Sequence, residues 1–534
     1  MSSETIVSPV LPPTLPPGAR NQSDVFAVHG ADPEVLAYAM AKYSRSALSM
    51  RESLNEISSQ RAEQFLNTFY FQYGHRSIAD LAHIAFAVER LSLLAAIVLV
   101  DETRWDGQER STRYQNFLKS GWYFPEFGGD ASAAELYSET INHLFTTYQR
   151  TSAAVHEALR RRIPRPETLK PEAYDRTLKA RAFDVARYLL PLATNTSLGQ
   201  IVNARTLETQ VSRLLSHPAA EVRDLGLKLR EAATGPAWNV NAQSAAAFVG
   251  KLEPTLAEEA AGLFTREVRT APTLVKYAEA NQYRIETQAE LAHAAEELLG
   301  GYSVAATPVV DLVERTESLE VELAATLLYS AAHHGYRQIR DLVAALPAAR
   351  VNEIIELGLR HRGRHDEAMR AFHAGAALRF DILMDIGGFR DMHRHRRCVQ
   401  IIQGFTALHG CEIPDCGDLE PGVDLLAEAG ILDEFKGALD GALAASARIA
   451  ASQAPEAAQS ALYLLPLATR IRSLFKMDFA EAQYISELRS APAGHFSYRR
   501  IAWEMYKAVE RQHPTLAKHF RVTDFTQPID LLQR

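Results

Sequence analysis

The heptapeptide YLLPLAT occupies residues 188–194 and recurs, residue for residue, at 463–469. Seven consecutive identities are hard to attribute to chance, so the chain carries an internal duplication. A helical pattern follows each copy and ends at a Ser-x-Pro-Ala step, at 216–219 and at 490–493. Since two copies are fewer than the three units that a repeat array needs, two fused domains are the better interpretation.

Upstream of the heptapeptide, each half has a short alternating segment that runs into a helical pattern. The first half alternates over 84–89 and continues as a helix over 91–103. The second half alternates over 380–385 and continues over 389–397. We therefore expect a strand that leads into a helix in both halves.

These patterns divide the chain into four segments. We place the first domain at 23–245 and the second at 303–534. Residues 246–302 are rich in Ala and Glu, with Leu and Val at helical spacing, and should form a helical connector. Residues 1–22 are Pro-rich and lack the basic start and apolar core of a secretory signal, so we expect a disordered or extended tail.

Composition is that of an ordinary cytoplasmic globular protein. The 534 residues are 47% hydrophobic and 23% charged, and they are too many for one compact core. A net charge of −8 gives no long-range attraction to nucleic acid or to an anionic membrane, so an anionic ligand needs a local cluster of Arg and His. The longest apolar run, 91–100, is far shorter than the ~20 residues that cross a bilayer.

The three cysteines are Cys398, Cys411 and Cys416. Their number and spacing describe neither a disulfide framework nor a zinc site. We therefore expect a protein of a reducing compartment, without a bound metal. Cys398 is best interpreted as a core residue.

Two polar clusters could hold an anion. Residues 106–114, DGQERSTRY, place Ser111 and Arg113 two residues apart in a turn, and Arg binds phosphate oxygens in a bidentate manner. A solvated polar loop is the simpler alternative. The second cluster, RHRR at 394–397, could also be a charged helix end or a nucleic-acid patch. The acidic total and the lack of interleaved aromatics disfavour the nucleic-acid patch.

The first half resembles the flavin-dependent (ThyX-type) thymidylate synthases over nearly its whole length. That family carries Arg-His-Arg-x-x-Ser-x-x-Glu-x-Ser-x-Arg-Tyr, preceded by Gly-His-x-Ser and followed by Arg-x-x-Leu-Pro and Asn-x-Arg-Ser-Leu. The chain matches these motifs in order at 74–77, 109–114, 187–191 and 203–207. The resemblance implies an α+β fold of two tandem domains, each an antiparallel sheet with helices.

Each half departs from the family where the other half matches it. In the first half Asp101-Glu102-Thr103 stands in place of Arg-His-Arg, and Asp106 replaces the next serine. Two like charges at ~4 Å repel by about 4 kcal/mol at an effective dielectric of 20, so these carboxylates would reject a phosphate. The second half has the triplet at 394–396 but lacks the Glu, Ser, Arg and Tyr that follow, and it substitutes Leu462, Asp478 and Ala480 in the later motifs.

The two incomplete signatures predict one composite site. In the family, the triplet of one subunit and the phosphate loop of another converge on one nucleotide. The resemblance therefore implies that the first half's loop meets residues 394–396, while the reciprocal site built on 101–103 is inactive. Two fused chains would reproduce the family's tetramer as a homodimer.

The resemblance also implies a role for each matched residue. The substrate, deoxyuridylate (dUMP) or a similar pyrimidine nucleotide, would be held by Glu109, Ser111, Arg113, Arg187 and Arg394. Arg213, which needs a one-residue gap in the alignment, is the catalytic candidate. The flavin would be lined by His75, Ser77, Asn203, Arg205, His395 and Arg396.

The implied reaction converts dUMP and methylenetetrahydrofolate to thymidylate (dTMP), with FAD that NADPH reduces. The protein contributes positioning and charge stabilisation, so no cysteine nucleophile is needed. Two alternatives remain. One is a related flavoenzyme that acts on another pyrimidine nucleotide, and the other is a catalytically silent scaffold that binds flavin or nucleotide.

Overall fold

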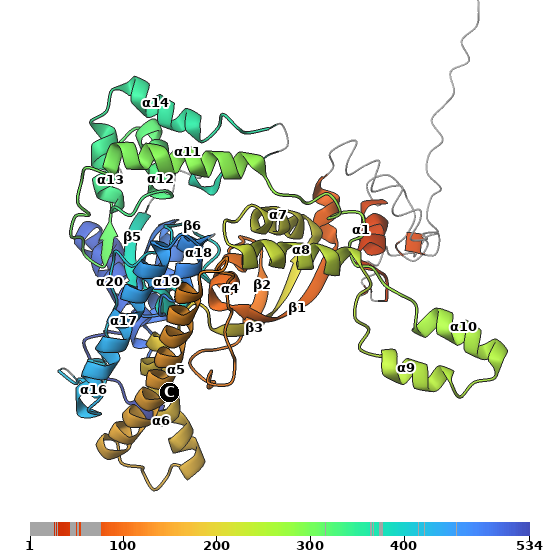
Figure 1. Ribbon diagram of the computed structural model, residues 1–534, viewed down its shortest axis with the longest axis horizontal. Coiled ribbons are helices and arrows are strands. Elements are labelled where there is room, and N and C mark those ends of the chain that lie inside the picture. Colours follow the sequence, from red (N-terminus) through yellow and green to blue (C-terminus); the bar gives the residue numbers. More distant parts are fainter. Residues whose placement is uncertain are drawn as a thin grey trace, which may run out of the picture.

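The computed structural model describes residues 26, 28, 30–42, 50, 53–54, 76–314, 317–363, 366, 368–372, 378–414, 416–420, 422–454, 456–518 and 520–533. The tail expected at 1–22 and the flavin candidate His75 lie outside the described residues. Within them the fold mixes helices with two antiparallel sheets, one from each half (Figure 1). This agrees with the expected α+β class.

The first sheet has the strand order β1-β3-β2. β1 (His83–Ser92) and β2 (Asp106–Glu109) both pair antiparallel with the central strand β3 (Asn195–Asn203). β1 leads directly into α4 (Leu93–Leu99), whose first turn is capped because the Ser92 hydroxyl accepts the backbone N–H of Ala95 at 2.9 Å. Two further helices follow β3, namely α7 (Ala204–Leu215) and α8 (Ala220–Thr234).

The second sheet repeats this order and adds one edge strand. β5 (Leu378–Asp385) and β6 (Val399–Ile402) flank the central β7 (Arg470–Met477), and β4 (Val310–Leu312) pairs with β5. β5 leads into α15 (Ile386–Met392) as β1 leads into α4, and β7 is followed by α19 (Phe479–Ser490) and α20 (Phe496–Gln512). The duplication read from the sequence is therefore visible in the topology.

The two copies of the heptapeptide meet each other. Pro191 and Pro466 form an antiparallel bridge. Leu192 donates its backbone N–H to Leu465 at 2.9 Å, and Leu467 donates to Leu190 at 2.9 Å. The two hydrogen bonds are equivalent, because residues 192 and 467 occupy the same position in the heptapeptide, and so do residues 190 and 465. The contact is therefore self-complementary, as at a two-fold axis. Both copies of the heptapeptide make the same contact, and this shared constraint accounts for their identical sequences.

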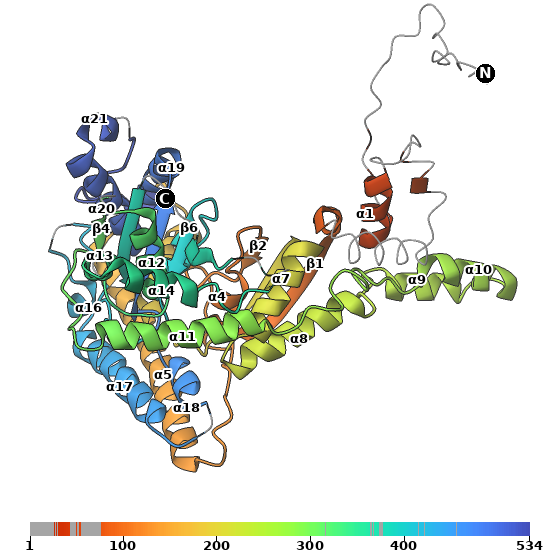
Figure 2. The ribbon, with the colours of Figure 1, turned by 90° about the horizontal axis from the view of Figure 1, so that it is seen from above.

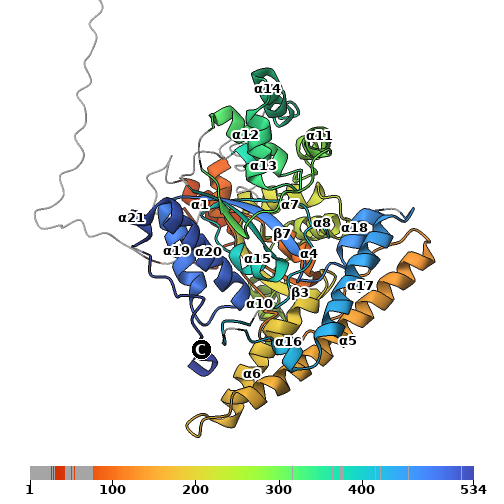
Figure 3. The same cartoon turned by 90° about the vertical axis from the view of Figure 1, so that its left-hand side faces the viewer.

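Long helices extend beside this junction. α5 (Ala131–Arg162) lies along α17 (Leu432–Ala450), so one helix of each half forms the pair seen in Figure 3. A single hydrophobic core runs through both halves. Further elements are α6 (Pro171–Ala186), α16 (Leu425–Glu428), α18 (Ala457–Leu462), α1 (Pro33–Lys42), α21 (Pro514–Ala517) and the 3-10 turns η2 (Arg76–Leu81), η3 (Arg187–Leu189), η4 (Arg370–Phe372) and η5 (Leu531–Gln533).

A helical layer covers the outer face of the second sheet. It consists of α11 (Gln282–Leu299), α12 (Leu319–Tyr329), α13 (Tyr336–Ala344) and α14 (Ala348–Leu357), which lie together in Figure 2. Charged pairs are buried beneath it, including Lys476–Glu322 at 3.0 Å and Arg472–Asp381 at 2.8 Å. On the corresponding face of the first sheet, Ile201 is 53% exposed.

Some element boundaries differ from the sequence interpretation. The heptapeptide is followed first by a strand, β3 or β7, and only then by the expected helix. The helix expected over 91–103 ends at Leu99, and that expected over 389–397 is α15, which ends at Met392. The cluster at 394–397 therefore lies in the turn after a helix. No described helix is both long and apolar enough to cross a membrane.

Residues 246–302 are helical only in part. α9 (Ala242–Val249) and α10 (Pro254–Phe264) form a projecting hairpin, and α11 belongs to the layer on the second sheet. The stretch 265–281 between them contains no helix. The expected connector is thus two separate helical structures.

Candidate functional site

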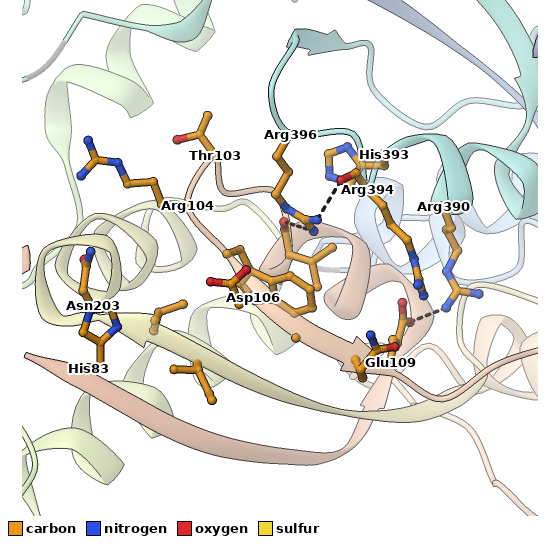
Figure 4. Close-up of a pocket in the computed structure, with 16 residues that line it drawn as sticks. His83, Thr103, Arg104, Asp106, Glu109, Asn203, Arg390, His393, Arg394 and Arg396 are labelled. Atoms are coloured by element: carbon orange, nitrogen blue, oxygen red, sulfur yellow. Dashed lines mark hydrogen bonds and ion pairs between the residues drawn. The ribbon is translucent and has the colours of Figure 1, made fainter. Parts of the chain in front are cut away.

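A cavity of about 550 Å³ lies where the two halves meet. The first half contributes the end of α4, the following loop, β2 and the end of β3. The second half contributes α15 and the turn that follows it (Figure 4). The side chains labelled in the figure are His83, Thr103, Arg104, Asp106, Glu109, Asn203, Arg390, His393, Arg394 and Arg396.

A smaller cavity adjoins the first and shares Glu109, Arg390 and Arg394 with it. Its other walls are residues 110–113, Arg187, Gly387 and Asp391. The first half's loop and the second half's Arg394 are therefore brought to one cavity. Of the residues expected at the substrate, all five line this smaller cavity: Glu109, Ser111, Arg113, Arg187 and Arg394.

Two buried arginines of this cavity have N–H groups without an acceptor among the described residues. Arg187 is only 1% exposed, and within the described chain its Nε and Nη2 have no hydrogen-bond partner. Its Nη1 lies 3.5 Å from the Thr112 hydroxyl and 3.6 Å from the Asp391 carboxylate. Arg390 pairs with Glu109, but its buried Nε has no acceptor among the described residues. Unfilled buried donors of this kind are costly, and an anion would satisfy them.

The two outer arginines of the triplet differ in how firmly they are held. Arg396 lies 4.6 Å from the Trp105 ring centre and donates to the Val100 carbonyl at 3.2 Å. Burial lowers its pKa, and the neighbouring Arg394 lowers it further. The Arg394 side chain is exposed, and no hydrogen bond or ion pair holds it within the described chain. Arg394 can therefore adjust to a ligand, whereas Arg396 is fixed.

Arg113 is already occupied by protein groups. It forms a bidentate pair with Asp184, at 2.7 and 3.2 Å, and also donates to the Tyr498 hydroxyl at 3.1 Å. Asp184 is in α6 and Tyr498 is in α20, so this arginine ties the loop to both halves. The Ser111 hydroxyl accepts the Arg113 backbone N–H at 3.2 Å. Arg113 thus positions the loop and has no free fork to offer a phosphate.

Two further candidates line neither cavity. Arg213 pairs with Glu102 at 2.8 Å and donates to the Val98 carbonyl at 2.7 Å. His395 accepts a hydrogen bond from Arg489 at 2.7 Å and lies 3.7 Å from Glu481. Burial, followed by Arg489 and Arg396, lowers the pKa of His395 to about 3, so its ring is neutral.

Of the remaining flavin candidates, one lines the larger cavity and two do not line either cavity. Asn203 lines the larger cavity, and its side-chain oxygen caps α7 by accepting the Thr206 backbone N–H at 2.8 Å. Arg205 pairs with Asp80 at 3.3 Å, and Ser77 is exposed in η2. Neither Arg205 nor Ser77 lines the two cavities.

The site also contains residues that belong to none of the family motifs. Arg390 lies one helical turn before Arg394, a spacing that could have signalled a shared face. Trp105, which forms the apolar floor under Arg396, lies outside every motif. His393 also lines the cavity, and its Nδ1 lies 2.7 Å from Gln400.

The triplet position of the first half is filled by protein carboxylates. Asp101 pairs with Arg370 and lies 3.6 Å from His393. Burial acts to raise the pKa of Asp101, but Arg370, His393 and Arg213 together hold it below its usual value. Glu102 is neutralised by Arg213. Both carboxylates are therefore internally compensated.

Comparison with known proteins assigns the family. A family model described as thymidylate synthase complementing protein matches residues 27–235 and again 311–515, together more than half of the chain. The chain belongs to the thymidylate synthase complementing protein family. The double match supports the tandem duplication.

The proteins that this chain is similar to are distant in sequence. A UPF0159 protein of Chlamydia pneumoniae is 28% identical over 95% of this chain and 93% of its own length. A UPF0159 protein of Thermoplasma acidophilum is 24% identical over 91% and 94%. A flavin-dependent thymidylate synthase of Clostridium tetani is 24% identical over 33% of this chain and 67% of its own length. A solved Helicobacter pylori ThyX, complexed with FAD and dUMP, shares 17% identity over 38% of this chain and 89% of its own, with a TM-score of 0.25.

Proposed function

We propose that the protein is a flavin-dependent thymidylate synthase, or a close relative, with one composite site between its two halves. Its substrate is dUMP or a similar pyrimidine nucleotide. Membership of the family supports the reaction class. The observation that carries the proposal is the convergence of Arg187, Arg390 and Arg394 on one cavity, with buried donors that have no acceptor within the described chain.

The nucleotide's phosphate is the ligand that these donors fit. Arg187 comes from the first half and Arg390 and Arg394 from the second, so an anion here is held by both halves. Arginine matches phosphate oxygens with two parallel hydrogen bonds, and the unpaired Nε and Nη2 of Arg187 present such a fork. Ser111 is available beside them as a further donor. Glu109 neutralises Arg390 from one side and orients it.

The larger cavity fits a flavin. Its volume of about 550 Å³ lies within the roughly 300–1,000 Å³ typical of cofactor and ligand sites. Trp105 supplies an apolar surface, Asn203 an amide, and Arg394 and Arg396 positive charge. When bound, reduced FAD supplies the hydride chemistry of methyl transfer, with methylenetetrahydrofolate as carbon donor and NADPH as reductant. The chain's own part is to hold the nucleotide against this cavity and to place positive charge beside the pyrimidine.

The reaction is tested by turnover with purified protein. FAD-loaded protein is incubated with dUMP, methylenetetrahydrofolate and NADPH, and dTMP is measured by chromatography. We expect dTMP from wild type and, at dUMP concentrations below its dissociation constant, about fivefold slower formation of dTMP by Arg394→Gln. Arg397→Gln is the matched control, because Arg397 is three residues away, is exposed, and pairs with Asp478 outside the cavity. Absence of dTMP with bound flavin and dUMP would exclude the synthase.

Two observations favour a second candidate, a silent nucleotide-binding scaffold. The engagement of Arg113 by Asp184 removes one expected phosphate contact, and the carboxylate of Asp106 lines the larger cavity. A protein that binds dUMP without binding flavin would select this candidate. A flavoprotein that turns over a different pyrimidine nucleotide would instead select the related enzyme.

A further inference from the structure

Asp385 is a buried carboxylate at the start of the helix that forms one wall of the site. It is 1% exposed and is the N-cap of α15, which carries Arg390 (Figure 4). Its Oδ1 accepts the backbone N–H of Gly388 at 2.6 Å, and its Oδ2 accepts the hydroxyl hydrogen of Ser497 in α20. Asn and Ser cap a helix about as well as Asp does, so capping alone does not explain a buried charge at this position.

The Asp385 carboxylate faces the Arg187 guanidinium across Gly387. A Cβ placed on Gly387 would lie 3.2 Å from Oδ1 of Asp385 and 3.5 Å from both Nε and Nη2 of Arg187. These are the two nitrogens that have no acceptor among the described residues. Burial raises the pKa of Asp385, and Arg187 opposes this rise more than any other group does. The two charges therefore interact, while Nε and Nη2 keep their hydrogens for a ligand.

The duplication supplies an internal comparison for this pair. Ser92 ends β1 and caps α4, as Asp385 ends β5 and caps α15. Leu462 precedes the second heptapeptide, where Arg187 precedes the first. The acid at the equivalent position is Glu221 in α8, which accepts hydrogen bonds from the hydroxyl and the backbone N–H of Ser92. Of the two equivalent caps, only the one that faces an arginine is itself acidic, which indicates that Asp385 and Arg187 act as a pair.

The other titratable groups around Asp385 are held in one state. Burial raises the pKa of Tyr188 well above its usual value, so its hydroxyl stays protonated. Burial lowers the pKa of His495, at the start of α20, well below its usual value, so its ring stays neutral. Glu412 pairs with Arg500 at 3.1 Å. Burial raises the pKa of Glu412, and Arg500 lowers it. Arg470 pairs with Asp385 in the register of the second sheet.

A separate small cavity gives Asp385 a route for a proton. This cavity measures about 10 Å³, roughly the smallest space that holds one water molecule. Its polar lining groups are Tyr188, Asp385, Glu412, Ser497 and Arg500. Asp385 lines this space, whereas Arg187 and Gly387 line the cavity assigned to the phosphate. A proton can therefore reach the carboxylate without passing through the ligand's cavity.

We propose that Asp385 is the internal counter-charge of Arg187 and takes up a proton when an anion occupies the small cavity of the composite site. This inference rests on the proposed function, in which the anion is the phosphate of the nucleotide. In the free protein, the ionised carboxylate balances the buried guanidinium. A bound phosphate supplies that negative charge instead, and two anions beside one arginine repel each other, so the carboxylate is neutralised by a proton from solvent. Asp385 is thus a positioning residue that acts through Arg187.

Proton uptake and nucleotide affinity are linked by this arrangement. Each unit by which the phosphate raises the pKa of Asp385 makes dUMP bind about tenfold more tightly to the protonated protein than to the ionised protein. The phosphate of dUMP has a second pKa near about 6, so at about pH 7 and above it is mostly a dianion and has few protons to release. Net proton uptake in that range therefore comes from the protein.

Isothermal titration of the full chain with dUMP measures this uptake. Titrations at about pH 7 and about pH 8, each in two buffers of different ionisation enthalpy, give the protons bound per dUMP. We expect wild type to take up protons. Asp385→Asn and Asp385→Ser keep the helix cap but remove the charge, so they should take up almost none and bind dUMP about tenfold more tightly at the higher pH. Asp478→Asn is the matched control, because Asp478 caps α19 in the same half and lines neither cavity of the site. It should take up protons as wild type does.

The outcomes separate this inference from the proposed function. Equal uptake by wild type and Asp385→Asn would overturn the role of Asp385. Loss of uptake in Glu412→Gln, with uptake retained in Asp385→Asn, would assign the proton to Glu412 and would also overturn it. If the Asp385 variants misfold, wild type alone decides, because dUMP binding without proton uptake refutes the inference and leaves the composite site intact. A wild type that does not bind dUMP would overturn the proposed function, and this inference with it.

Discussion

A double-mutant cycle on Arg187 and Arg394 tests whether one anion is held by both halves. Arg187→Lys keeps the buried charge but removes the fork formed by Nε and Nη2. Arg394→Gln removes the charge of an exposed side chain that no other described group holds. The two residues are on different halves, and they share only the small cavity.

The expected losses differ because the two side chains differ in burial. A hydrogen bond to a charged group is worth about 1.5–3 kcal/mol, so Arg187→Lys should weaken dUMP binding roughly ten- to a hundredfold. Arg394 is exposed and screened by solvent, so Arg394→Gln should cost only about 1 kcal/mol, or about fivefold. If both arginines contact the same phosphate, the loss of dUMP binding free energy in the double variant should differ from the sum of the two single losses by about 0.5 kcal/mol or more.

Isothermal titration with dUMP at fixed ionic strength measures each dissociation constant. Thermal melting is recorded for each variant, because Arg187 is buried and its replacement could alter folding. Arg397→Gln serves as the control for charge alone. Strict additivity of the two losses, or a loss from only one residue, would mean that the two arginines do not share a ligand.

Three other outcomes follow from the structure. Asp418 lies fully buried between Arg181 and Arg499, so Asp418→Asn leaves two buried cations without their carboxylate and should cost about 3–5 kcal/mol in urea unfolding. The exposed Glu420→Gln is its control and should cost less than about 1 kcal/mol. The pKa of the buried His395 is about 3 in the folded protein and near 6.5 in the unfolded chain. As the pH falls below 6.5, the unfolded chain therefore binds a proton at this imidazole while the folded protein does not. The free energy of unfolding should therefore fall by up to about 1.4 kcal/mol for each unit by which the pH is lowered. His395→Asn, compared with wild type at about pH 7 and about pH 5, should show a smaller dependence of this free energy on pH. Flavin titration should saturate near one FAD per chain, because Asp101 and Glu102 at the reciprocal position are already paired with Arg370 and Arg213 and the cavity that they line is only about 20 Å³; a value near two would contradict this.

The fold was predictable where the sequence repeats itself. The heptapeptide and the alternating segments at 84–89 and 380–385 located the duplication and the strands β1 and β5. The central strands β3 and β7 were missed. β3 reads NTSLGQIVN, with a glycine and five polar residues, and its alternation of buried and exposed positions becomes evident only when the covered face is known.

The candidate site was predictable only in outline. The motif matches predicted that Ser111, Arg187 and Arg394 hold the same substrate. In the structure these three residues line one cavity. The partner of Arg113 could not be predicted, because Asp184 is 71 residues away and reaches it through the packing of α6. Likewise, no local pattern shows that Glu102 would engage Arg213. Such pairings depend on tertiary contacts, which sequence spacing does not encode.

The asymmetry of the two halves has one electrostatic explanation. A buried arginine requires a negative partner, and the partner can be a ligand or a residue of the chain. At the composite site the Asp391 carboxylate lies 3.6 Å from Nη1 of Arg187, but Nε and Nη2 have no acceptor among the described residues, and on the proposed function a bound phosphate supplies these acceptors. At the reciprocal position, Asp101 and Glu102 supply that charge to Arg370 and Arg213. On the proposed function, the acidic residues at 101 and 102 do more than reject a phosphate: two internal carboxylates take the place of the external anion, so this position needs no ligand to balance Arg370 and Arg213. On this reasoning, dUMP should raise the melting temperature of wild type, and the rise should shrink in Arg187→Lys but not in Asp101→Asn. An equal reduction in both variants would show that the ligand's charge is shared between the two positions.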